Sequence, residues 1–273
     1  MTKIEACAVT HKGLVRTNNE DNYYLNGELL DEDKADNYIQ SYVSKDGPEH
    51  IFAVCDGMGG QASGEKASHT AVKLLKKIHS WIAENNDKKD MEVLIKWLNN
   101  YVLKTNEYIF NMSLESGSRM GTTFACLLVY KKKAVVLNLG DSRVYIIRNG
   151  ELKQLSCDHT EAERLIRLGI LTRESAKNHK SKNLLSRHFG ISPEEGIIEA
   201  EISDIIDLEP GDLFLICSDG LTNMLEDSHI KEIIVNKNGL SHACDELVEE
   251  ALKKGGMDNI TSLLVSIESV ENN

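Results

Sequence analysis

Four aspartates stand at the tips of apolar segments of strand length, and their recurrence has a clear chemical meaning. In each case the aspartate lies within two residues of an end of the segment. A single Asp-Gly after a strand is usually a turn, but a carboxylate at the end of a buried strand is also held by a stiff base. The four are Asp56 after Ile51–Cys55, Asp141 after Val135–Leu139, Asp219 after Leu213–Cys217, and Asp258 before Ile260–Ile267.

Aspartates without an accompanying set of His or Cys favour a hard cation, Mg²⁺ or Mn²⁺, over zinc. Two such ions about 3.5–4 Å apart can activate a shared water and hold a phosphoryl oxygen. We expect Asp56 to bridge the two ions, with Asp219 and Asp258 completing the ligands of one. The carbonyl of Gly57 would reach the other, since a glycine lets backbone approach closely. The sequence therefore predicts a two-metal centre.

Composition excludes several classes of protein. The chain has 273 residues, of which 41% are apolar and 27% charged, as is ordinary for a globular protein. No apolar run approaches the ~18 residues of a membrane span, and the N-terminal residues lack a secretory signal, so we expect a cytoplasmic protein that does not bind membranes. The net charge is −12, which argues against nucleic acid as a partner. The six cysteines form no CxxC pair, so we expect buried thiols.

The apolar period changes along the chain from that of strands to that of helices and back. An Asn149-Gly150 hairpin signal joins two of the later strands. Four segments have an amphipathic, helical period and should cover sheets. The expected strands are Ile4–Thr10, Tyr23–Leu25, Ile51–Cys55, Thr122–Tyr130, Lys133–Leu139, Arg143–Arg148, Glu151–Leu155, Glu199–Leu208, Asp212–Cys217 and Ile260–Ile267; the helices are 65–84, Met91–Leu114, Asp227–Val235 and Ser241–Lys254.

Hairpin-linked strands together with two helix pairs predict an α+β fold. We expect a four-layer α-β-β-α sandwich, in which two packed, mainly antiparallel sheets are flanked by the helix pairs. Residues 1–273 would form a single domain. The polar stretch 26–49 is expected to be a surface excursion or a hairpin extension, and residues 157–196 an insertion over one end of a sheet.

Six short motifs occur in order along nearly the whole chain. They are Arg16-Thr17-Asn18-Asn19-Glu20-Asp21, Val54-Cys55-Asp56-Gly57-Met58-Gly59-Gly60, Met120-Gly121-Thr122-Thr123, Gly140-Asp141-Ser142-Arg143, Cys217-Ser218-Asp219-Gly220-Leu221 and Asp258-Asn259-Ile260-Thr261. In this order they resemble the metal-dependent protein serine/threonine phosphatases of type 2C. The likeness is greatest to the compact bacterial stand-alone members, which oppose Ser/Thr kinases.

The resemblance implies a role for each matched residue. Two catalytic Mn²⁺ or Mg²⁺ ions would be bound, with a third site of the kind found in bacterial members. The implied roles are: Asp56 and the Gly57 carbonyl at the bridge between the ions, Asp219 and Asp258 on the first ion, Glu20 and Asp21 holding the waters of the second, and Asp141 with Asp219 at the third.

The resemblance also implies the reaction and the partners. Arg16 matches the arginine that grips the substrate phosphate, a good fit of a guanidinium fork to a dianion. A metal-bridging hydroxide would attack phosphorus directly, without a covalent intermediate. The substrates would be phosphorylated proteins, including targets of a Ser/Thr kinase and the kinase itself, and the enzyme is expected to be a monomer. Residues 157–196 match the family's flap.

Two positions depart from the wider family. Some members, notably animal ones, have a histidine after the central Asp-Gly as a candidate general acid, whereas this chain has Met58, as bacterial relatives do. The flap segment His179–Asn183 also lacks a His-Pro pair expected in many bacterial members. The departures leave the general acid and the substrate preference open.

Simpler interpretations of single residues remain. Asp21 could cap a turn, Asp141 could bond backbone near Arg143, and Arg16 alone would be a surface arginine; His159 is expected to be solvated or structural. A non-catalytic phosphoprotein-binding module with the same fold is the alternative function, marked by loss of metal carboxylates, and none of the matched ones is lost. A two-metal phosphodiesterase or nuclease is disfavoured by the charge of −12.

Overall fold

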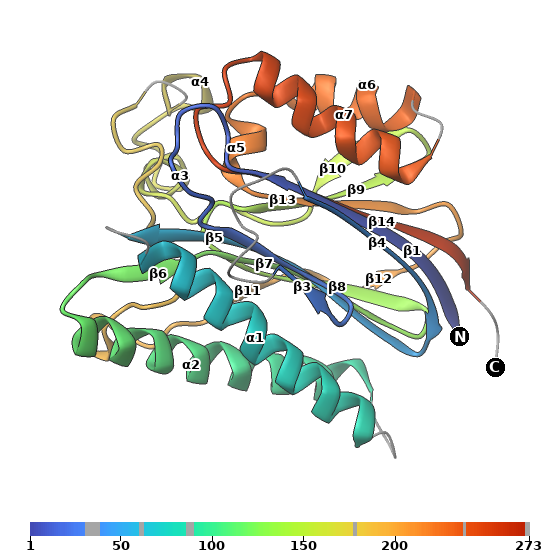
Figure 1. The fold of residues 1–273 in the computed structure, drawn as a ribbon, viewed down its shortest axis with the longest axis horizontal. Helices are drawn as coiled ribbons and strands as arrows, with labels where there is room; N and C mark the ends of the chain where they lie inside the picture. The colour runs from blue at the N-terminus through green and yellow to red at the C-terminus, as the bar shows by residue number, and fades with distance from the viewer. Residues whose placement is uncertain (31–38, 60–62, 86–89, 177–178, 237–238, 271–273) are drawn as a thin grey trace.

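Two antiparallel β-sheets lie face to face in the computed structural model, and helices cover the outer face of each (Figure 1). The structure describes residues 1–30, 39–59, 63–85, 90–176, 179–236 and 239–270. In Figure 1 the layers run from α1 and α2, through the two sheets, to α6 and α7. The predicted four-layer α-β-β-α arrangement is therefore confirmed.

The first sheet joins the two ends of the chain. Its first and fourteenth strands pair from Thr2 opposite Val270 to His11 opposite Ile260, so the loop after His11 lies beside the residues before Ile260. In order across the sheet the strands are β10 (Glu151–Gln154), β9 (Arg143–Arg148), β13 (Leu213–Cys217), β14 (Ile260–Val270), β1 (Thr2–His11) and β4 (Ile39–Gly47).

The second sheet centres on β5, the long strand that carries Asp56. Strand β12 (Ile206–Asp207) lies beside β8, and β6 (Met120–Thr122) pairs with the end of β5 from Gly57 to Gly59. Across the sheet the order is β11 (Glu201–Ile202), β8 (Lys133–Leu139), β7 (Phe124–Tyr130), β5 (Glu49–Gly59), β2 (Asp21–Leu25) and β3 (Glu28–Leu29).

The helices begin and end where the local sequence provides caps. Asp90 accepts a hydrogen bond from the Val93 amide at the start of α2, and Gly117 ends that helix in the left-handed conformation. Helices α1 (Ser63–Glu84) and α2 (Met91–Ser116) cover the second sheet, and α5 (Asp219–Thr222), α6 (Asp227–Asn236) and α7 (Leu240–Lys253) lie on the first. Between α2 and α5 in the sequence come α3 (Glu161–Arg167), α4 (Arg173–Ala176) and a 3₁₀ turn (Pro193–Glu195).

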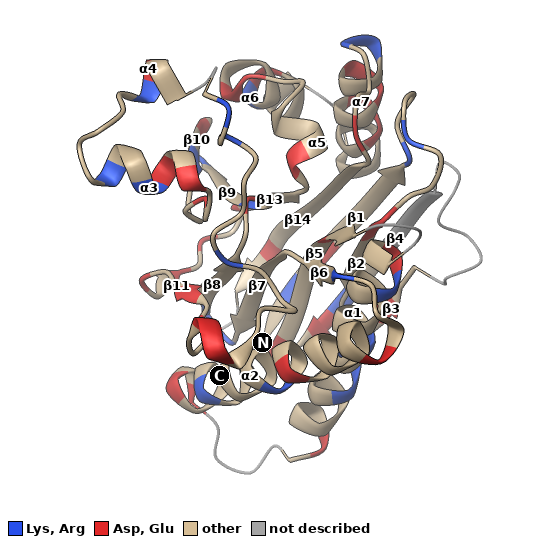
Figure 2. Ribbon diagram, turned by 90° about the vertical axis from the view of Figure 1, so that its left-hand side faces the viewer, with Lys and Arg blue, Asp and Glu red and all other residues tan. Residues whose placement is uncertain are grey.

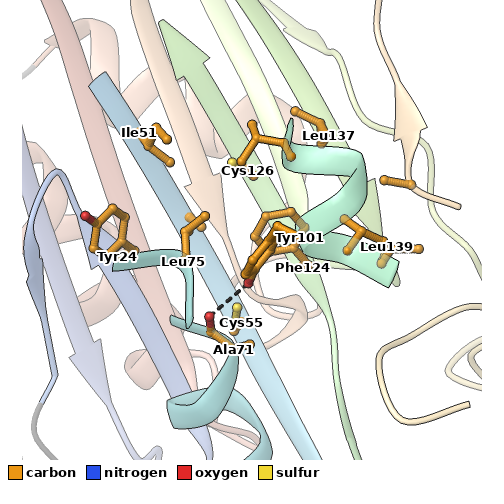
Figure 3. Close-up of a cluster of buried hydrophobic side chains, with 14 of the residues drawn as sticks. Tyr24, Ile51, Cys55, Ala71, Leu75, Tyr101, Phe124, Cys126, Leu137 and Leu139 are labelled. Atoms are coloured by element: carbon orange, nitrogen blue, oxygen red, sulfur yellow. Dashed lines mark hydrogen bonds between the residues drawn. The ribbon is translucent and has the colours of Figure 1, made fainter. Parts of the chain in front are cut away.

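Three apolar clusters fill the spaces between the four layers. The cluster between the second sheet and helices α1 and α2 is drawn in Figure 3, where the Tyr101 hydroxyl donates to the Ala71 carbonyl at 2.9 Å. That hydrogen bond satisfies the polar end of a buried aromatic ring. Close packing on both faces of both sheets makes the strand ends a rigid base for the residues that follow them.

Residues 26–49 contain two strands of the sandwich. Of the two expectations for this stretch, the hairpin extension is the nearer, because β3 pairs with β2 in a hairpin; β4 in addition pairs with β1 from Thr10 opposite Ile39 to Thr2 opposite Gly47. Strand β4 lies at the edge of its sheet, where a polar strand can be held by backbone hydrogen bonds to its neighbour. Among the described side chains of β4, that of Val43 is buried. Residues 31–38, part of that stretch, lie outside the described residues. The expected strand Glu199–Leu208 is divided into β11 and β12.

Candidate active site

Seven of the eight residues predicted for the site line one pocket of about 240 Å³ at an end of the sandwich. Asp56 comes from β5, Asp219 begins α5 directly after β13, and Asp258 precedes β14. Figure 2 faces this end of the molecule, where α3 and α4 lie beside the ends of the strands. The seven are Arg16, Glu20, Asp56, Gly57, Asp141, Asp219 and Asp258.

Burial and neighbouring carboxylates raise the pKa values of Asp56 and Asp219. Burial raises the pKa of Asp56 well above its usual range, and the charges of Asp21, Asp219, Asp141 and Asp258 raise it further. Burial also raises the pKa of Asp219 to about 6, with Asp258 adding to the shift and a hydrogen bond with Asp56 opposing it. Carboxylates crowded in this way need protons or a cation to be stable together.

Asp21, the eighth predicted residue, lies beneath the pocket instead of lining it. It is buried, and its Oδ2 accepts hydrogen bonds from the hydroxyls of Ser218 (2.7 Å) and Thr261 (2.6 Å). Its Oδ1 is buried without a hydrogen-bond partner among the described residues. Burial raises the Asp21 pKa to about 7, while the two hydroxyls lower it. An unsatisfied carboxylate oxygen next to Asp56 is suited to a cation or its water.

Arg16 contacts one of the predicted metal ligands. Its Nη2 donates to Asp258 Oδ2 at 2.7 Å, and its side chain is 52% exposed. Hydrogen bonding to Asp258 raises the Arg16 pKa, so the guanidinium stays charged. The free face of this fork is available to an anion entering the pocket.

Gly57 is required by the close approach of three backbone segments. Its amide donates to the Glu20 carbonyl at 3.1 Å. A Cβ atom at position 57 would lie 2.2 Å from the Gly64 carbonyl oxygen and 2.5 Å from that of Glu20. Only glycine lets β5, the Glu20 segment and the start of α1 come together in this way.

Asn259 is a positioning residue to which the sequence analysis gave no role of its own. Its Oδ1 accepts from the Glu20 amide at 2.8 Å, and its Nδ2 donates to the carbonyls of Lys12 and Asn18 at 2.9 Å each. The side chain is 5% exposed. Its place in the Asp258-Asn259 motif was the available signal, because a buried asparagine next to a functional carboxylate often holds neighbouring backbone.

Thr123 joins strand β5, which carries Asp56, to the loop between β8 and β9, which carries Asp141. Its hydroxyl accepts from the Asp56 amide at 2.8 Å and lies 2.7 Å from the Ser142 hydroxyl, while its amide donates to the Asp56 carbonyl at 2.9 Å. The backbone on either side of the pocket is thereby fixed by a buried hydroxyl pair. The Thr122-Thr123 motif pointed to this position but not to its contacts.

The rest of the lining is apolar or neutral. Met58 lies in the wall where some relatives of the predicted family have histidine, and Asn183 and Leu185 come from the segment 157–196. No histidine, lysine, cysteine or tyrosine is among the described residues that line the pocket. A second hollow of about 460 Å³ adjoins it and shares Arg16, Glu20 and Gly59.

The donor set suits a hard divalent cation. As the side chains stand, no three His, Cys, Asp or Glu residues of the described ranges are gathered closely enough to coordinate one ion. In this arrangement Asp258 is paired with Arg16, and Asp219 is hydrogen-bonded with Asp56. A cation would replace both contacts, and all the available donors are oxygens, as Mg²⁺ and Mn²⁺ prefer.

Comparison with known proteins decides the family. The model of protein phosphatase 2C matches residues 7–260. The chain belongs to the protein phosphatase 2C family. The serine/threonine phosphatase Stp of Listeria welshimeri is 34% identical over 258 residues, which cover 94% of this chain and 93% of that protein. The protein phosphatase PhpP of Streptococcus pneumoniae is 34% identical over 265 residues, covering 97% and 98%.

Solved structures of 2C-type phosphatases have the same fold. The serine/threonine phosphatase of S. agalactiae superposes with a TM-score of 0.83 at 27% identity, covering 97% of this chain and 100% of its own. The catalytic domain of PstP, solved in complex with two manganese ions, gives 0.77 at 28% identity, with 98% and 100% covered. As a member of the 2C family, this chain is a metal-dependent serine/threonine protein phosphatase that acts on phosphoproteins. None of the helices in the described ranges could span a membrane.

Proposed function

We propose that this phosphatase hydrolyses phosphoserine and phosphothreonine at the pocket around Asp56, with two Mn²⁺ or Mg²⁺ ions. The observation that most supports this is the meeting of Asp56, Asp219 and Asp258 with Arg16 in one lining. These side chains come from segments up to 242 residues apart in sequence, so their meeting is a product of the fold.

The ligands are assigned from the donors present. Asp56 would be shared between the two ions, with the Gly57 carbonyl on one and Asp219 and Asp258 on the other. Glu20 and Asp21 would hold the waters of the second ion, and the unpartnered Oδ1 of Asp21 supports that role. Asp141, with Asp219, would hold a third ion. When bound, the ions would supply hydroxide at neutral pH and neutralise charge on the phosphate.

The chain's own groups bind and orient the substrate. The exposed face of the Arg16 guanidinium would hold two phosphate oxygens, which fixes the phosphorus over the carboxylates. Metal binding to Asp258 would free the Arg16 nitrogen that now contacts it. Because the described lining contains no histidine, lysine, cysteine or tyrosine, the proton for the departing serine or threonine oxygen would come from water.

Several properties of the whole protein are also proposed. Residues 1–273 would act as a single phosphatase unit, with residues 157–196 as a flap beside the pocket, since Asn183 and Leu185 lie in its wall. The enzyme would work as a cytoplasmic monomer and oppose a Ser/Thr kinase, acting on the kinase and on its substrates.

The test uses an aryl phosphate and a phosphothreonine peptide. We expect turnover of both with Mn²⁺ and none after chelation. Asp56→Asn should reduce kcat by about a thousandfold or more, because several kcal/mol of metal assistance would be lost. Asp204→Asn is the matched control, since Asp204 is exposed between β11 and β12. If Asp56→Asn retained normal Mn²⁺-dependent turnover, the assignment would be wrong.

A further inference from the structure

Three exposed apolar residues stand next to Arg16 and Asp258 in the sequence, on the two loops that the Arg16–Asp258 contact joins. Leu14 is 65% exposed, Val15 57% and Met257 56%. Val15 directly precedes Arg16, and Met257 directly precedes Asp258, both of which line the pocket. We call Leu14, Val15 and Met257 the apolar rim.

The backbone fixes the apolar rim in place. The Leu14 amide donates to the Gly256 carbonyl at 2.8 Å, which joins the two loops that carry the rim. Gly13 has φ +82°, and a Cβ there would lie 2.2 Å from the Asp258 carbonyl oxygen and 2.7 Å from that of Gly256. Asn259 also ties the first loop at Lys12 and Asn18. The rim is therefore preorganised, which lowers the entropic cost of binding a partner.

The position of the rim limits what can cover it. A substrate phosphate that enters the pocket passes Arg16. In the substrate chain, the Cα atoms of the neighbouring residues are about 3.8 Å apart, so these residues stay close to the pocket. Because Arg16 and Asp258 on the same loops line the pocket, a substrate chain would pass the loops that carry Leu14, Val15 and Met257 within a few residues of its phosphate. Continuity with the pocket thus makes the phosphoprotein substrate the natural occupant of this surface.

We propose that the apolar rim binds apolar side chains next to the phosphorylated residue, so that the enzyme prefers phosphoserine or phosphothreonine flanked by residues such as Leu. This rests on the proposed function of the pocket and adds a sequence preference to it. Burial of a leucine against the rim would remove apolar surface from water on both partners. The expected preference is about tenfold in kcat/KM, from the transfer of one such side chain.

The experiment compares two phosphothreonine peptides on the Mn²⁺-loaded full chain. They differ only in the residues flanking the phosphothreonine, which are Leu in one and Ser in the other. The double variant Leu14→Ser/Val15→Ser is measured against Leu103→Ser/Val235→Ser. In this matched control Leu103 (44% exposed) lies on α2, and Val235 (50% exposed) lies near the end of α6, toward the start of α7 and away from Gly256.

We expect the unmodified enzyme and the control to favour the leucine peptide about tenfold, mainly through KM, and the rim variant to lose most of that preference. The ratio of the two peptides cancels any shift of Arg16, because both carry the same phosphate. An unmodified enzyme without the preference, or a rim variant that keeps it, overturns the proposal. A rim variant that keeps the preference but changes the size of the particle in solution would instead make the rim a contact between two copies.

The aryl phosphate separates this inference from the proposed function. If the unmodified enzyme hydrolyses aryl phosphate with Mn²⁺ but treats both peptides alike, the pocket assignment stands and the rim proposal fails. If it hydrolyses neither aryl phosphate nor peptide, both fail.

Discussion

Asp21 and Asp56 lie directly opposite each other on the neighbouring antiparallel strands β2 and β5. Like charges in a cross-strand pair destabilise a sheet, and here Asp21 is buried while Asp56 lines the pocket together with Asp219. The chain thus places carboxylates where folding alone disfavours them, as expected where a bound cation later compensates.

This crowding predicts that the metal-free enzyme loses stability as pH rises from about 4 to 7. The folded pKa values of Asp21 (about 7) and Asp219 (about 6) exceed the ordinary 3.8. The folded state therefore binds more protons than the unfolded state in this window, and unfolding becomes easier with rising pH. A loss of about 2 kcal/mol would lower Tm by roughly 4–8 °C.

Melting curves with chelator at pH 5 and pH 7.5 test this, and repeating them with Mn²⁺ should remove or reverse the difference. Asp21→Asn should reduce the pH effect in the metal-free protein, because the amide does not ionise. A Tm that rises between pH 5 and pH 7.5 without metal would contradict the argument.

A second prediction concerns Arg16, which has two potential partners. Removing it should weaken phosphate binding, so Arg16→Ala should lower kcat/KM by about a hundredfold, and Arg16→Lys by about tenfold since the fork is lost. Mn²⁺ affinity, measured by calorimetry, should stay the same or increase, because Asp258 is released from its contact. Equal losses of metal and substrate affinity would show that Arg16 supports the metal ligands instead.

A third prediction is that Asn259→Ala destabilises the fold more than loss of an exposed asparagine does. The substitution leaves the Glu20 amide and the carbonyls of Lys12 and Asn18 without the partners that Asn259 provides. The expected cost is about 3 kcal/mol, since buried unsatisfied groups are expensive. Asn85→Ala, which removes one exposed hydrogen bond to Trp81, should cost less than about 0.5 kcal/mol. Denaturant unfolding of both variants makes the comparison.

The sequence predicted the layers well because they depend on local periodicity. Amphipathic helices such as Met91–Leu114 and hairpin signals such as Asn149-Gly150 each specify an element within a few residues. The residues of the pocket were predictable because each aspartate belongs to a motif at a strand end. Their individual roles stay predictions, and the structure adds that Asp21 lies under the pocket.

What the sequence could not reveal depends on contacts between distant segments. Strand β4 is polar and is held by its backbone pairing to β1, so periodicity gave no sign of it. The three hydrogen bonds of Asn259 and the Arg16–Asp258 contact join residues more than 200 positions apart. His159, expected to be solvated or structural, is 4% exposed and bonded on both ring nitrogens.

The last prediction is that His159 positions the loop of Asp141 through its Nδ1. This atom accepts from the buried Gly140 amide at 3.2 Å, so the proton is on Nε2, which donates to Glu201 at 3.0 Å. Asparagine can imitate the Nδ1 contact and glutamine the Nε2 contact. Loss of the Nδ1 contact leaves the buried Gly140 amide without its hydrogen-bond partner. Loss of the Nε2 contact costs less, because the Glu201 side chain is 39% exposed and can bind water instead.

His159→Asn should therefore keep near-normal Mn²⁺ affinity and kcat, while His159→Gln should lower kcat by about tenfold, the equivalent of one unsatisfied buried amide. Exchange of the Gly140 amide hydrogen in the metal-free protein gives a readout that does not depend on activity, and it should be faster in the glutamine variant alone. If instead the asparagine variant is impaired and the glutamine variant is normal, the contact with Glu201 is the one that matters, and the loop of Asp141 is held by other bonds.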